Sequence, residues 1–115
     1  MILDDHNSPF IRVLVKRPGE DLRPQVIENT LKALQDLVGG HIESSTPFTD
    51  LAILCNEEGR LLGLPHNVNL LGVDFVGPIV FVGVVRDRFV SVPRSAERLI
   101  KAYLCRRRDN HAESH

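Results

Sequence analysis

The chain has 115 residues, a formal net charge of −1, 43% hydrophobic residues and 25% charged residues. This length suffices for one domain with its own core, and the composition is ordinary for a soluble globular protein. The near-neutral charge argues against a nucleic-acid surface, and the apolar runs are too short for a membrane span. Neither nucleic acid nor a membrane is therefore expected as a partner.

Cysteine use and the N-terminus indicate the compartment. Cys55 and Cys105 are too few for a disulfide framework, and their apolar neighbours suit small buried residues in a reducing environment. Asp4 and Asp5 stand where a secretion signal has basic residues. We therefore expect a cytoplasmic protein.

Apolar and β-branched segments predict short strands along the chain. In order they are residues 10–15, 24–28, 41–45, 51–55, 60–64, 78–85 and 89–92. Pro24 restricts the second strand to an edge or a strand start. The apolar run at 78–85 indicates a central strand buried on both faces. Ser45-Thr46-Pro47 is expected to end the third strand.

Turns are expected on both sides of the strand at 60–64. Residues 56–59, Asn-Glu-Glu-Gly, fit a hairpin loop that returns the chain as that strand, because Gly59 can take the positive φ of a bulge. Asn67 is expected to cap one short helical turn that runs to Leu71. Residues 86–88 predict a tight charged turn before the last strand.

Two segments predict amphipathic helices. Asn29 is the expected N-cap of the first, in which Leu31, Leu34 and Val38 recur at helical spacing, and Gly39-Gly40 ends it. The second begins near Pro93, a residue suited to a first helical turn. Its predicted apolar face consists of Ala96, Leu99, Ile100, Tyr103 and Leu104.

These elements predict an α+β fold. We expect one domain over residues 1–105, with a mainly antiparallel sheet of five to seven short strands and two amphipathic helices packed on one face. Residues 106–115 are expected to form a disordered tail.

Charge is distributed unevenly along the chain. Residues 1–85 carry 6 basic and 11 acidic side chains, whereas residues 86–115 carry 8 basic and 4 acidic ones. Arg106, Arg107 and Arg108 form a basic patch in sequence. A basic end complements the dipole of a helix, and a weak surface for a polyanion or an acidic partner is the alternative.

No residue pattern predicts catalytic residues, a metal site or a cofactor. The spacings C-x-x-C and H-E-x-x-H do not occur, and Gly39-Gly40 follows a helix, where a phosphate loop would precede one. Cys55 and His66 could act as nucleophile and base only if the fold brought them together.

One polar group is the candidate binding site. It consists of Asn56, Arg60, His66, Asn67 and Asp74, and we expect some of these side chains to line a cleft. Capping and turn-forming roles are the alternative explanation for the same residues.

Several short motifs resemble a family of small proteins from bacteria, phages and mobile elements. The motifs are Gln35 with Val38-Gly39-Gly40 and Ile42-Glu43, then Asn56-Glu57-Glu58-Gly59, then Leu64-Pro65 with Asn67, then Gly77-Pro78, Val80, Val82 and Gly83. The family is a domain of unknown function, numbered three-eight-four-six, and the resemblance covers roughly residues 11 to 104. An Arg often follows the Asn67 position in the family, whereas this chain has Val68. The resemblance implies a setting among accessory genes and no mechanism.

The sequence therefore favours a small accessory protein that works by binding a protein and is not an enzyme. Apolar strands in a small chain leave sheet edges that need a partner, so a homodimer or other homo-oligomer is a second expectation. Two alternatives belong to other classes. One is a small-ligand binder or hydrolase with a cleft near His66, Asn67 and Asp74, and the other is weak nucleic-acid association through Arg106–Arg108.

Overall fold

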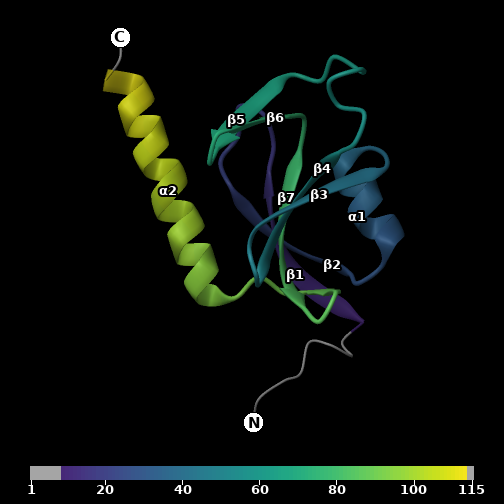
Figure 1. Ribbon diagram of the computed structural model, residues 1–115. Helices are drawn as coiled ribbons and strands as arrows, with labels where there is room; N and C mark the ends of the chain where they lie inside the picture. The colour runs from purple at the N-terminus through teal and green to yellow at the C-terminus, as the bar shows by residue number, and fades with distance from the viewer. Residues whose placement is uncertain (1–8, 114–115) are drawn as a thin grey trace.

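The structure is a computed structural model that describes the backbone of residues 9–113 and the side chains of residues 9–105. Within that part of the chain it contains eight strands and two helices, and Figure 1 shows one helix on either side of the main sheet. In chain order the elements are β1 (Phe10–Lys16), β2 (Arg23–Glu28), α1 (Leu31–Val38), β3 (Ile42–Phe48), β4 (Leu51–Asn56), β5 (His66–Leu70), β6 (Val73–Val76), β7 (Ile79–Val85), β8 (Arg88–Val90) and α2 (Arg94–Glu113).

The main sheet has the strand order β2-β1-β7-β4-β3, and all neighbouring strands are antiparallel. β8 also pairs with β7. Gly83 of β7 pairs with Leu51 of β4 on one side and with Val90 of β8 on the other. β8 therefore pairs with the same edge of β7 as β1 does, but at the other end of the strand. β5 and β6 form a separate two-stranded sheet. The predicted α+β class with a mainly antiparallel sheet is confirmed.

The central strand β7 is buried on both faces, as its apolar run predicts. Alternate residues of a strand point to opposite faces. Val80 belongs to a cluster that includes Leu34 of α1, whereas Phe81 belongs to a second cluster that includes Leu104 of α2. The helices therefore cover opposite faces, and the prediction that both pack on one face is wrong. A helical pattern shows which side of a helix is buried, but not which sheet face receives it.

The first helix is capped one residue later than predicted. The Thr30 hydroxyl accepts a hydrogen bond from the Ala33 N–H at 3.1 Å, so Thr30 and not Asn29 is the N-cap. Asn29 instead donates from its side chain to the Phe89 carbonyl at 3.4 Å. The predicted end is confirmed, because Gly39 takes the left-handed conformation with φ 82° and bonds back to Gln35.

Strand β3 continues through the predicted break at Ser45-Thr46-Pro47. Its register with β4 shifts between Ser45 and Phe48, which marks a bulge that accommodates Thr46 and Pro47. β3 is an edge strand, so the missing N–H of Pro47 leaves no neighbouring strand unpaired. Phe48 re-enters the ladder opposite Leu51.

The predicted hairpin strand at residues 60–64 is wrong. Both edges of β4 are already occupied by β3 and β7, so a returning strand has no edge to pair with. Residues 57–63 instead form successive turns, closed by the Leu62 N–H to the Glu58 carbonyl at 2.9 Å and the Leu64 N–H to the Gly59 carbonyl at 3.0 Å.

The helical turn predicted from Asn67 to Leu71 is also absent from the described chain, because these residues belong to the β5–β6 hairpin. Leu71 and Gly72 have φ of 52° and 84° and form its two-residue turn. The charged turn at residues 86–88 is confirmed, with Arg86 and Asp87 both at positive φ.

The C-terminal helix extends beyond the predicted domain boundary. The backbone of α2 runs Arg94–Glu113, whereas the side chains after Cys105 and residues 114–115 lie outside the described part. The predicted disorder of residues 106–115 stays a prediction. Among the described residues, no helix has the length and apolar character needed to cross a membrane.

Gly83 lets the chain cross from β8 to the α2 face of the sheet. A Cβ atom built on Gly83 would lie 2.4 Å from the backbone oxygen of Ser91, closer than any real contact. The segment that passes over Gly83 also bonds to β1: the Val92 N–H donates to the Arg12 carbonyl at 3.0 Å, and the Ser91 hydroxyl accepts from the Arg12 N–H at 2.9 Å. This crossing fixes where α2 begins.

We predict that Gly83→Ala lowers the free energy of unfolding by about 2–3 kcal/mol, because the new methyl group meets backbone that must shift. Urea denaturation measures the change. Gly63→Ala is the matched control: Gly63 has φ 68° but open space around it, so its cost is about 1 kcal/mol from backbone strain alone. An equal loss of unfolding free energy in the two variants would contradict a close contact between Gly83 and Ser91.

Candidate functional site

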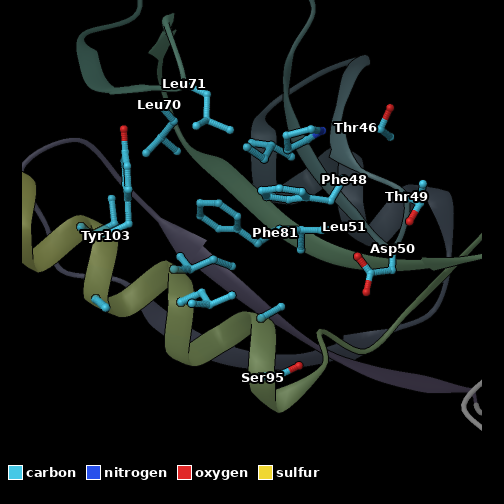
Figure 2. A pocket seen from close by; sticks show the side chains of 17 residues that line it. Thr46, Phe48, Thr49, Asp50, Leu51, Leu70, Leu71, Phe81, Ser95 and Tyr103 are labelled. Atoms are coloured by element: carbon cyan, nitrogen blue, oxygen red, sulfur yellow. The ribbon is translucent and has the colours of Figure 1, made fainter.

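An open hollow of about 1060 Å³ separates α2 from part of the sheet, and we name it the α2 groove (Figure 2). Its floor is Leu51, Ile53 and Phe81 from the central strands β4 and β7. One wall is α2, the other is the end of β3 with the turn that follows, and the β5–β6 turn closes one end. The lining residues are Thr46, Pro47, Phe48, Thr49, Asp50, Leu51, Ile53, Leu70, Leu71, Phe81, Ser95, Ala96, Leu99, Ile100, Ala102, Tyr103 and Leu104.

The lining is mainly apolar, and three large apolar side chains at its rim are exposed. Phe48 is 57% exposed, Leu71 is 59% exposed and Leu99 is 73% exposed, and each comes from a different wall. Figure 2 shows the rings of Phe48 and Phe81 near the middle of the hollow. Exposed apolar side chains gathered around one hollow are a feature of interaction sites.

Leu71 is held in a conformation that leucine avoids. Its φ of 52° lies in the left-handed region, where a residue with a Cβ is strained and asparagine or glycine is preferred. The chain thus places an exposed leucine at a strained turn position beside the groove. Such strain persists where the residue serves something other than stability.

An ion pair between the half-buried Arg12 and the buried Glu97 holds the first turns of α2 against the sheet. Arg12 of β1 donates to both carboxylate oxygens of Glu97, with the Nη2–Oε2 distance at 3.1 Å. Lys101, one turn further along α2, lies 3.1 Å from the same carboxylate. The Glu97 side chain is 6% exposed, so its charge depends on these partners.

The electrostatics of this pair favour the ionised carboxylate. The hydrogen bond from Arg12 lowers the pKa of Glu97 from 4.5 to about 2; burial opposes the shift, and Lys101 adds to it. The pair fixes the position of α2 at one side of the floor, over β1 and β7, and the groove remains beside it.

The predicted candidate residues lie outside the α2 groove. Asn56 is buried on the opposite face, where its side chain donates to the Val38 carbonyl at the end of α1 at 3.2 Å and accepts from the Glu58 N–H at 2.8 Å. It joins the end of α1 to the turn after β4. The family motif around Asn56 therefore has a clear architectural use.

Arg60 and Asp74 are in contact, but the contact is to the Asp74 backbone and not to its carboxylate. The Arg60 guanidinium donates to the Asp74 carbonyl at 2.7 Å, and the Asp74 carboxylate accepts from the Asn69 side chain at 2.8 Å. These contacts are exposed and brace the β5–β6 hairpin against the preceding turn.

His66 and Asn67 point to different surroundings. His66 is exposed on β5. Asn67 donates to the carbonyls of Lys16 and Gly77, both at 2.7 Å, and accepts from the Lys16 ammonium at 3.0 Å. Asn67 thus ties β5 to the end of β1 and to the loop before β7. A ligand or partner role for the five candidate residues stays a prediction.

The remaining candidates give no reactive centre in the described chain. Burial, with the nearby Glu43 carboxylate, raises the pKa of the half-buried Cys55 thiol, which is the opposite of an activated nucleophile. Cys105 is exposed, so its predicted burial is wrong. Among the described residues, no group of three His, Cys, Asp or Glu side chains is placed to hold a metal ion. The side chains of Arg106, Arg107 and Arg108 lie outside the described part.

Sequence reasoning missed the groove because its rim residues come from three distant segments. Leu99 was expected on the packed face of α2, and the structure leaves it exposed. The ion pair had a signal in the sequence. Arg12 interrupts an apolar strand, and Glu97 lies one turn before Ile100 on the buried side of α2. Two opposite charges at otherwise apolar positions indicate a buried pair.

We predict that Glu97→Gln lowers the free energy of unfolding at pH 7 by about 2–3 kcal/mol, because it removes a buried charge from its hydrogen-bonded partner. The folded-state pKa is depressed, so this stability is present above pH 4.5 and is lost as pH falls toward 2. Urea denaturation at pH 7 and at pH 2 should show the difference between wild type and variant largely disappear at the lower pH.

Asp36→Asn is the control for that experiment. Asp36 pairs with Lys32 at 3.3 Å on the exposed side of α1, where an ion pair contributes less than about 1 kcal/mol. A difference for Glu97→Gln that stays constant from pH 7 to pH 2 would contradict the depressed pKa.

Residues 11–104 match the family described as Domain of unknown function (DUF3846). Comparisons with curated proteins and with solved structures gave no match. The matched region therefore runs from β1 to Leu104 of α2. The protein is a member of the DUF3846 family.

Proposed function

We propose that this protein acts by binding another protein through the α2 groove. The observation that carries the proposal is the set of exposed rim residues, Phe48, Leu71 and Leu99, around an apolar floor. Interaction sites expose apolar side chains that a partner then covers, and aromatic residues are enriched at the centres of such sites. An accessory role in a bacterium, phage or mobile element belongs to the same proposal and is supported by the family resemblance alone.

The shape of the groove favours a polypeptide over a small molecule. Small-ligand sites have volumes of about 300–1000 Å³ and enclose most of the ligand. The α2 groove, at about 1060 Å³, is at the upper end of that range, but it is open to solvent and its rim residues are exposed (Figure 2). Its polar groups are the hydroxyls of Thr46, Thr49, Ser95 and Tyr103 and the carboxylate of Asp50, spread along the rim. Spread polar groups fit the edge of a protein interface.

We predict that Leu71→Asn raises the stability of the protein but weakens its binding to the partner. Asparagine followed by Gly72 is the preferred pair for this turn, so the variant should gain about 1 kcal/mol of stability by relief of strain. It also removes an apolar rim side chain, so partner capture should weaken. Thermal denaturation and the capture experiment described next measure the two effects. Loss of stability would show that Leu71 packs as an ordinary core residue.

A capture experiment tests the binding function itself. The tagged protein is used to retain partners from a lysate of its source organism, with mass spectrometry as the readout. We predict that a partner held by wild type is lost with Phe48→Ser/Leu99→Ser. Both side chains are more than half exposed, so the variant should fold with little change in stability.

Leu61→Ser/Leu62→Ser is the matched control for capture. These leucines are 87% and 61% exposed on the turn after β4 and do not line the α2 groove. The control should retain the partner. Equal retention by all three proteins, or loss with the control alone, would reject the α2 groove as the binding surface.

A further inference from the structure

We infer that the occupant of the α2 groove is an acidic amphipathic helix of about two to three turns. The inference rests on the proposed binding function and specifies the partner's chemistry. Three features of the structure lead to it: the width of the sheet face, the length of the α2 wall and the charges that border that wall.

The sheet face is wider than the one helix that packs on it. Five paired strands spaced about 4.8 Å apart give a face of about 19 Å. Packed helices lie about 8–10 Å apart, so one helix covers about two strands. α2 packs through Leu104 and Glu97 over β7 and β1, and the apolar floor over β4 is left to the groove. The β5–β6 hairpin covers part of this face and the floor residues are at most 5% exposed, so a second helix beside α2 would rest on the exposed rim.

The length of the wall sets the length of the occupant. On α2 the lining runs from Ser95 to Leu104. At 1.5 Å per residue this stretch is about 14 Å long, which corresponds to two to three helical turns. An occupant of that length presents apolar side chains at spacings of three and four residues toward the floor.

The charge of the wall selects an acidic occupant. Up to Cys105, the exposed charged residues of α2 are Arg94, Arg98 and Lys101, all basic, while Glu97 is buried against Arg12. Lys101 already contacts Glu97. Arg94 and Arg98 form no ion pair with any described residue.

Arg98 does not line the groove but neighbours its lining on the surface of α2. It lies three residues after Ser95 and four before Ala102, two residues that line the groove, and residues at these spacings are neighbours on a helix surface. The charged residue among the lining is Asp50, on the opposite wall. Acidic side chains of the occupant therefore belong on its α2 side. A two-fold dimer that pairs this groove with itself would place the arginines of both copies at one interface, which disfavours such a homodimer.

Two synthetic peptides test the inference with purified full-length protein. Each has about 15 residues, enough for measurable helix formation, with leucine at spacings of three and four and alanine elsewhere on the apolar side. One carries Glu at the remaining positions and the other carries Lys. Fluorescence anisotropy should show the Glu peptide binding about 10-fold or more tightly than the Lys peptide, with an advantage that falls as salt rises.

Charge reversal on α2 supplies the second arm. Arg94→Glu/Arg98→Glu should remove or invert the preference. Arg23→Glu/Arg88→Glu changes net charge equally and should leave the preference intact, because Arg23 pairs with Val15 on the α1 face and Arg88 lies beside the start of α1. Equal binding of both peptides would overturn the acidic preference while leaving the α2 groove as a binding surface.

Other results would overturn the occupant altogether. Binding of neither peptide would reject a helix, and the capture experiment would then decide separately whether the binding function stands. Preferential binding of a single-stranded oligonucleotide, lost with Arg94→Glu/Arg98→Glu, would make the partner a nucleic acid. A wild-type dimer in sedimentation that Phe48→Ser/Leu99→Ser converts to a monomer would make the occupant a second copy.

Discussion

The structure depends on one constraint, which is that the central strand β7 is apolar on both faces. A sheet built around such a strand must be covered on both sides, and the chain supplies a different cover for each. α1 packs on one face, whereas α2 and the β5–β6 hairpin share the other. The two helices differ in how they are held. α1 is short and capped at both ends, whereas α2 is long and is fixed to the sheet by its first turns.

The position of α2 follows from two local features of the sheet. The close crossing at Gly83 determines where the chain reaches the α2 face, and the Arg12–Glu97 pair then fixes the first turns over β1 and β7. With α2 held there, the floor residues are nearly buried, whereas Phe48, Leu71 and Leu99 around them stay exposed. The α2 groove is thus a consequence of how the helix is attached, and its exposed rim is the part of the molecule that a partner would complete.

Local signals predicted the elements whose patterns are strong and whose partners are not in question. β1, β4 and β7 follow from apolar β-branched runs, and α1 follows from its periodicity and Gly39.

The predictions that failed did so because of tertiary contacts. Residues 60–64 resemble a strand, but β4 has no free edge for them, and the Asn67 segment pairs with β6 in place of forming a helical turn. The candidate polar residues were real features of the sequence, and Asn56 and Asn67 are joined to backbone at element ends. The groove could not be predicted, because Phe48, Leu71 and Leu99 are distant in sequence and come to line one hollow only in the folded chain.

The central claim is that the apolar rim of the α2 groove is exposed in the free protein. Methyl NMR with a soluble paramagnetic agent measures this directly, through the relaxation that solvent contact adds to each methyl group. The account predicts strong relaxation at the methyls of Leu71 and Leu99, comparable with Leu61, and protection at Leu34 and Leu54 in the core. Protection of Leu71 and Leu99 equal to that of the core methyls in a monomer would mean that the chain itself covers the rim, and would contradict the account.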